Sequence, residues 1–237
     1  LFTLTWCIST STRPRFCLPD IEKINNVAVA DISKLDSITF ADGQKVNNQD
    51  VSLVTDAHTL ISTSTASNAT SIDISSGIDS TYDVYMFDFI NLNAATDNTT
   101  FQFQVNATDG ADYNDSAITS THFAAFNDEP SEGTSSGLYY DTSRDAAQST
   151  SGIPLEHYVG NGADESISGR MWLYAPSSGT YVKHWMAQFS ENAQHNAAYS
   201  TYVAGYINDT TAIDDIRFNM ASGNLDGVIK MYGLAKS

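Results

Sequence analysis

Positive charge is scarce in this sequence. Only 11 Lys and Arg stand against 28 Asp and Glu in 237 residues, which gives a formal net charge of −17. A surface of that sign repels phosphate backbones and anionic lipid headgroups. The charge balance therefore argues against nucleic-acid packaging and membrane-surface binding, and we expect neither nucleic acid nor membrane insertion.

Cysteine and long apolar runs are scarce as well. The two cysteines, Cys7 and Cys17, have no histidine nearby and cannot complete a four-ligand zinc site. They leave two alternatives open, a pair of free thiols or one local disulfide. Apolar runs such as 82–92 are far shorter than the roughly 20 residues that span a bilayer.

Sequence motifs typical of enzymes are either absent or lack the secondary structure that they need. Residues 133–137 match the nucleophile-elbow string, but no helix is predicted after them, and that motif needs a strand-to-helix turn. The five histidines lack metal-binding spacing, and no acid pair stands out as a glycosidase pair would. The oxygen-rich stretch 109–115 lacks EF-hand spacing, so we expect a solvated hairpin loop there. We therefore predict a non-enzymatic protein without cofactor or metal.

An eleven-residue repeat is present in residues 21–53. Lysine recurs at positions 23, 34 and 45, and an aliphatic residue follows each time: Ile24, Leu35 and Val46. Short strands at 27–30 and 38–41 favour a β-rich stalk, although an eleven-residue period also fits a right-handed helical supercoil. So short a unit cannot cover its own apolar side, so we expect neighbouring chains to do so. Ile24, Leu35 and Val46 are accordingly the candidate oligomerisation residues.

From about His58 onward the hydrophobic period is two, as in half-buried strands. In 99–107, apolar residues at 101, 103 and 105 alternate with polar ones, which predicts a half-buried strand. The stretch 82–92 is apolar on both faces, which predicts a strand in the middle of a sandwich. The other predicted strands are 71–75, 121–126, 138–142, 153–159, 168–175, 181–189, 199–207, 213–220 and 228–234. Strands at this spacing predict an all-β fold, most simply a jelly-roll-like β-sandwich.

These patterns divide the chain into three predicted parts. Residues 1–20 differ in composition from the rest and form an N-terminal arm, residues 21–56 form the repeat-containing stalk, and residues 57–237 form the sandwich.

Aromatic residues suggest one binding hypothesis. Flat rings pack well against the CH groups of sugar rings, so a group of them could form a sugar-stacking platform. Alternating bulky residues, as in 171–174, more often form sandwich core, and both interpretations stay open. The candidates are Tyr139, Tyr140, Trp172, Tyr174 and Trp185.

Several stretches resemble structural proteins of marine tailed phages. Residues 212–234 look like the closing strand pair of those proteins, and residues 80–91, 101–105 and the run from Lys23 to Ile32 resemble the same group. Such proteins are fibre, appendage or decoration subunits and are usually trimeric. The resemblance covers about residues 21–237 and transfers no catalytic residue.

The resemblance implies a structural protein on the surface of a virion, either a tail fibre or a capsid decoration. Its N-terminal region would attach to other virion proteins, and its sandwich would face outward with host-surface glycans as candidate ligands. A secreted carbohydrate-binding module or bacterial adhesin is the alternative.

Overall fold

The computed structural model of the chain describes residues 58–110, 112–129 and 135–234, together with four two-residue strands nearer the N-terminus. The chain divides into two units, residues 1–55 and residues 56–237. The predicted N-terminal arm, with both cysteines, lies outside the described residues.

In the first unit, two copies of the repeat form the same small structure. Strand β1 (Lys23–Ile24) pairs with β2 (Val27–Ala28), and β3 (Lys45–Val46) pairs with β4 (Gln49–Asp50), both antiparallel and both with two residues between the strands. Each pair starts with a lysine and its following aliphatic residue. Leu35 and the predicted strand 38–41 lie outside the described residues, and the part that this region plays in oligomerisation stays a prediction.

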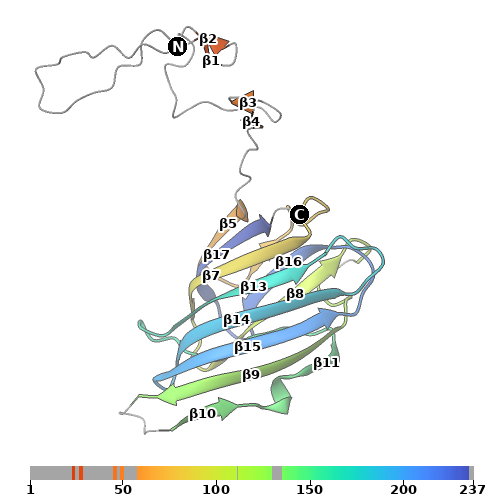
Figure 1. Ribbon diagram of the computed structural model, residues 1–237. Coiled ribbons are helices and arrows are strands. Elements are labelled where there is room, and N and C mark those ends of the chain that lie inside the picture. The colour runs from red at the N-terminus through yellow and green to blue at the C-terminus, as the bar shows by residue number, and fades with distance from the viewer. Residues whose placement is uncertain are drawn as a thin grey trace, which may run out of the picture. The chain divides into compact units, whose positions relative to one another are not determined.

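The second unit is an all-β sandwich of two antiparallel sheets, as predicted, while the finer jelly-roll topology stays a prediction (Figure 1). A short 3-10 turn, η3 (Thr142–Arg144), joins β10 to β11. The larger sheet has nine strands in the order β10 (Ser136–Tyr139), β9 (Ile118–Asp128), β15 (Ala197–Ile207), β14 (Lys183–Ala193), β13 (Ser166–Tyr174), β7 (Val84–Ala94), β17 (Leu225–Leu234) and β5 (His58–Ala69), with β11 (Ala146–Ser149) also paired to β9. The smaller sheet has the order β12 (Ile153–Val159), β8 (Thr99–Ala107), β16 (Ile213–Met220) and β6 (Ile72–Ile74).

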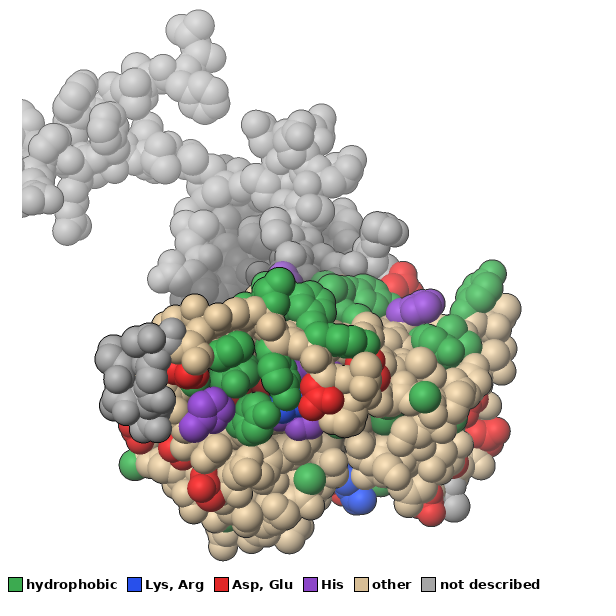
Figure 2. Space-filling view, turned by 90° about the horizontal axis from the view of Figure 1, so that it is seen from below, with side chains coloured by type: hydrophobic (Ala, Val, Ile, Leu, Met, Phe, Trp, Pro, Cys, Tyr) green, Lys and Arg blue, Asp and Glu red, His purple; other side chains and the backbone are tan. Residues whose placement is uncertain are grey.

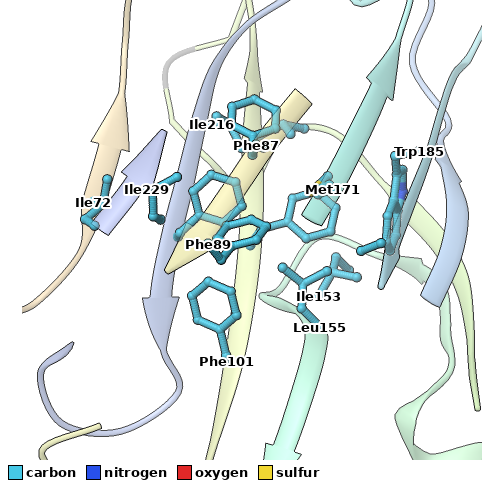
Figure 3. Packing of buried hydrophobic residues seen from close by; sticks show 14 of the residues in the cluster. Ile72, Phe87, Phe89, Phe101, Ile153, Leu155, Met171, Trp185, Ile216 and Ile229 are labelled. Carbon is cyan, nitrogen blue, oxygen red and sulfur yellow. The ribbon is translucent and has the colours of Figure 1, made fainter. Parts of the chain in front are cut away.

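Strict alternation of apolar and polar residues explains the core. In β8, every second residue from Thr99 to Ala107 is buried and the residues between them are half-buried, as the period of two predicts. Strand β7 lies in the interior of the larger sheet, between β13 and β17. Its Phe87 and Phe89 point into the sandwich, where they meet side chains of the smaller sheet (Figure 3).

Phenylalanine rings join the two sheets. The ring of Phe89 in β7 lies 5.5 Å from that of Phe101 in β8 and 5.1 Å from that of Phe218 in β16, both edge to face. Aromatic pairs prefer this arrangement because the positive edge of one ring meets the negative face of the other. These rings form the centre of the main hydrophobic cluster.

The larger sheet has nine strands and the smaller sheet four, so different parts of the larger sheet are covered by different strands. At the side of β9 and β15, the strand of the smaller sheet that packs against the larger one is β12. A second, small hydrophobic cluster forms there from Ala124, Ala193, Ala197 and Tyr199. Buried polar side chains gather beside it.

Candidate functional site

The outer face of the larger sheet carries an aromatic and methionine-rich surface. Because side chains alternate along a strand, Trp172 in β13 points outward, between two core residues of the same strand. The strand register places Met86 of β7 on one side of Trp172 and Met186 of β14 on the other. Next to this row, Phe123 and Tyr202 stack with their ring centroids 5.4 Å apart. Met86 is 3% exposed, whereas Met186, Phe123 and Tyr202 are 41–50% exposed, so the sheet presents apolar side chains to solvent on β9, β14 and β15.

Beside Trp172 the outer face is hollowed into an open groove of about 390 Å³. Short side chains create the hollow: Ser168, Ser190 and Ser200 occupy neighbouring positions on β13, β14 and β15. Longer side chains from the adjacent row form the wall. The groove is lined by Asp88, Ser168, Gly169, Arg170, Trp172, Gln188, Phe189, Ser190 and Ser200.

Polar groups at the wall are held in place by one another. Arg170 Nε donates to Asp88 Oδ1 at 2.6 Å, and the Arg170 guanidinium lies 5.8 Å from the centre of the Trp172 ring. Gln188 Nε2 donates to Tyr202 Oη at 2.9 Å. The groove therefore presents one ring face together with fixed carboxylate, guanidinium and amide groups, which suits a ligand with both apolar patches and hydroxyl groups.

The structure separates the five aromatic candidates into three places. Trp172 and Tyr174 lie half-buried on the outer face of β13, where the Tyr174 hydroxyl donates to the sulfur of Met186 at 3.2 Å. Trp185 lies in the core with 2% of its surface exposed, and its ring packs 4.7 Å from that of Phe103, so no ligand can stack on it. Tyr139 and Tyr140 lie at the β10 edge, away from the groove lining. The five do not form one platform.

A second group of polar side chains lies inside the sandwich, where β12 approaches β9 and β14. Glu156 and Glu191 are 1% and 4% exposed, and the hydroxyl of Thr201 donates to Glu156 Oε1 at 3.0 Å. His122 is fully buried, and its ring meets that of His157 edge to face with centroids 5.3 Å apart. We call this group, with Arg144, the polar cluster.

Arg144 enters the polar cluster from η3. It is 5% exposed, and its guanidinium carbon lies 4.7 Å from the centre of the Tyr139 ring and 4.5 Å from that of Tyr158. Tyr158 has a positive φ of 65°, an unusual conformation for a bulky residue. The cation is thus held between two rings, one of which comes from a strained position.

Burial sets the protonation of this cluster. It raises the pKa of Glu156 to about 7, against the opposing effect of the Thr201 hydrogen bond. Burial and the charge of Glu156 raise the pKa of Glu191 well above its usual value. Burial, followed by the charge of Arg144, lowers the pKa of His122 to about 4 and that of His157 to about 3. Near neutral pH both imidazoles are therefore uncharged, and the carboxyl pair retains a proton.

The sequence offered only a faint signal of the polar cluster. The histidines showed no metal-binding spacing and no acid pair stood out, because the members come from five separate elements. The available signal was the alternation of side chains along a strand. Glu191 falls at one of the inward-facing positions of β14, and Glu156 lies in an otherwise mostly apolar strand. Within the described ranges, no three His, Cys, Asp or Glu side chains are arranged to hold a metal ion.

Comparisons with known proteins give neither a family nor a function for this chain. No protein-family model, curated protein or solved structure matches this chain. In the part of the chain that the structure describes, no helix has the length and apolarity needed to cross a membrane.

Proposed function

We propose that this chain is a non-enzymatic structural subunit of a virion appendage, and that its sandwich binds host-surface glycans through the outer-face groove. The observation that carries the glycan part is the half-buried Trp172 beside a groove lined by serines, Gln188, and the ion-paired Asp88 and Arg170. A ring face takes the CH side of a sugar, while fixed polar groups meet its hydroxyls.

The charge of the protein narrows the ligand class. With a net charge of −17, the surface repels polyanionic chains at long range. Arg170, the cation that lines the groove, is already paired with Asp88. We therefore propose neutral glycans as the ligands.

The groove favours binding over hydrolysis. A glycosidase needs two carboxyl groups on either side of the scissile bond. The groove lining contains one carboxylate, Asp88, and Arg170 engages it. Glu156 and Glu191 point to the inside of the sheet and line no part of this groove.

Binding is tested with the full chain and an array of neutral glycans, followed by calorimetry on the best ligand. We expect Trp172→Ala to weaken binding at least about fivefold, because the stacking of a flat ligand ring such as a nucleic-acid base on one aromatic side chain contributes about 1–3 kcal/mol. The matched control is Tyr181→Ala, which removes a 74% exposed ring outside the groove. Equal binding by both variants, or no binding to any neutral glycan, would contradict the glycan proposal.

The appendage part of the proposal rests on the resemblance and on the repeat. We propose that residues 21–56 assemble the chain into a homotrimer and attach it to other virion proteins. Changing Ile24, Leu35 and Val46 together to Asp should dissociate the oligomer and leave the sandwich folded, because buried charges without partners are costly. Light scattering measures the mass, and an unchanged mass would contradict the assembly role. Immunogold labelling of virions with an antibody to residues 57–237 tests the location.

The second candidate function, a secreted carbohydrate-binding module or adhesin, is favoured by the same groove. It differs in its assembly: it predicts that the full chain is a monomer and that no virion is labelled.

A further inference from the structure

The polar cluster contains buried polar atoms that lack partners. Both ring nitrogens of His122, Nε2 of His157, Oε2 of Glu156 and both side-chain oxygens of Glu191 are buried without a hydrogen bond to another group in the described structure. Buried polar atoms are almost always paired, so a concentration of orphans at one place needs a physical reason. A proton on one of the two carboxyl groups explains the carboxyl oxygens among these atoms, because it lets one group donate a hydrogen bond to the other.

The two carboxyl groups form a hydrogen bond when one of them carries a proton. Glu191, whose pKa burial and the neighbouring Glu156 both raise, keeps the proton and donates it to Glu156. Two charged carboxylates in the same place would repel each other and leave their oxygens without donors. Near neutral pH the pair therefore carries a single negative charge.

Arg144 balances that charge. Its positive charge acts on Glu156, Glu191 and both buried histidines. Arg144 Nε also lies 3.8 Å from Asp141 Oδ2, so the cation is shared between that partly exposed carboxylate and the carboxyl pair. One proton on the carboxyl pair therefore limits the buried negative charge that Arg144 faces. The other titratable groups around the pair include Asp141, Asp145, Tyr139, Tyr158, Glu165, His195 and Tyr199.

The segment that delivers Arg144 lies at one edge of the larger sheet. Residues 136–149 (β10, η3 and β11) pair with β9 only, and β11 does so with an irregular register. Their side-chain attachments include Asp145 Oδ1, which accepts from the backbone N–H of His122 at 3.0 Å, and Arg144 between its two rings. Figure 2 views the molecule from the β9–β11 side, where hydrophobic, acidic and histidine side chains lie close together.

We propose that the proton shared by Glu156 and Glu191 keeps the segment 136–149 closed over this end of the sandwich, and that loss of this proton opens it. Without the proton, two negative charges face one cation in a closed, poorly hydrated interior. Opening admits water to both carboxylates. The segment can open without breaking other strand pairs because it pairs with β9 alone, and its departure also releases the positive φ of Tyr158 from the packing that maintains it.

The inference is independent of the proposed glycan binding, because none of the polar cluster lines the outer-face groove. It is tested by amide hydrogen exchange of the full chain between about pH 6 and pH 10, corrected for the intrinsic rate. If opening releases one proton, the opening constant of residues 136–149 rises up to about tenfold per pH unit from the ordinary carboxyl pKa up to the upper pKa of the closed pair, and levels off above it. Protection in β7 and β13 should stay constant.

Two variants distinguish opening caused by loss of the shared proton from opening caused by high pH in general. Glu191→Gln keeps the shape, cannot lose a proton, and offers an N–H donor to Glu156, so its segment should remain closed up to about pH 10 with less than about a twofold change. Asp97→Asn, at an exposed carboxylate, should behave as the wild type.

An infrared spectrum at pH 7 gives a second measurement that does not depend on opening. The carbonyl band of a protonated carboxyl group should be present in the wild type and weaker in Glu191→Gln, where only Glu156 can still carry a proton. Absence of this band from the wild type, or the same pH dependence of exchange in wild type and Glu191→Gln, would overturn the inference.

Discussion

Two regions of the same interior are equally buried and chemically opposite. In the main core, rings from β7 pack against rings from β8 and β16 at 5.1–5.5 Å, and no polar group is needed. In the polar cluster, carboxyl, imidazole and guanidinium groups are just as inaccessible to solvent. The main core is stabilised by the area removed from water, whereas the polar cluster is stable only while its charges balance.

The difference follows from how each region is covered. Around Phe89, β8 and the part of β16 from Ile216 to Met220 supply regularly alternating apolar residues. At the other end, the covering strand β12 has two register irregularities against β8, and Glu156 and Val159 lie beside them. An irregular strand cannot keep a strict inside–outside alternation, so polar side chains reach the interior there.

The largest loss of stability is expected from a substitution in the main core. Phe89→Ala should lower the free energy of unfolding by about 4 kcal/mol, because it removes a buried ring and leaves a cavity between the sheets. Urea denaturation measures the loss. The control is Ile90→Ala on the same strand, whose side chain is 39% exposed and faces outward, and which should cost about 1 kcal/mol or less. Similar losses for both variants would contradict the assigned faces of β7.

In the polar cluster, removal of the cation should be nearly as harmful. Arg144→Met should lower the free energy of unfolding by about 3 kcal/mol at pH 7, because the charge on the carboxyl pair loses its buried partner. Arg170→Met breaks the ion pair on the outer face, where the arginine side chain is 46% exposed, and should cost about 1 kcal/mol or less. An equal effect of the two substitutions in urea denaturation would show that Arg144 is not a buried counter-charge.

The buried histidines should make the stability of the protein depend on pH, whereas the main core should not. In the folded state the pKa of His122 is lowered to about 4 from the 6.5 of an exposed imidazole. The unfolded chain therefore binds more protons between about pH 6.5 and pH 4, and stability is lost as the pH falls through that window, by about 3 kcal/mol at most. His122→Phe should remove this part of the acid dependence, whereas His184→Phe, at an exposed position, should retain it. Urea midpoints at pH 7 and pH 4.5 are the measurement.

The smallest effect is expected on the outer face. Trp172→Ala should change the free energy of unfolding by about 1 kcal/mol or less, because the ring is only half-buried and lines an open groove. Thermal and urea unfolding would check this. A loss comparable to that of Phe89→Ala would make Trp172 a structural residue and weaken its use as a binding probe.

Much of the sandwich could be predicted from the sequence, because alternation reports the faces of a strand directly. The predicted strands 99–107, 153–159 and 213–220 match β8, β12 and β16 residue for residue. Strand β5 was not among the predicted strands, since its run of Ser and Thr carries little hydrophobic alternation. Pairing with β17 makes it a strand, and that partner lies more than 150 residues away.

The sites were less accessible to prediction, because they depend on which strands become neighbours. Alternation could show that Trp172 and Leu173 face opposite sides, but it could not show which side was the core. The groove needs serines from three strands in adjacent positions, and the polar cluster needs Arg144 and Glu191 brought together from distant elements. Such neighbours are set by strand order, which composition and period do not contain.

Strand β5 has a mechanical consequence for an anchored protein. It is the first strand of the sandwich, it lies at the edge of the larger sheet, and its first residue, His58, pairs with Leu234 near the end of β17. A load applied through the N-terminal part of the chain acts at this one end of the strand. The residue pairs would then bear the force one after another, as in unzipping, rather than together as in shear. A pulling experiment should record release of the twelve residues of β5 as a first, low-force step before the sandwich ruptures.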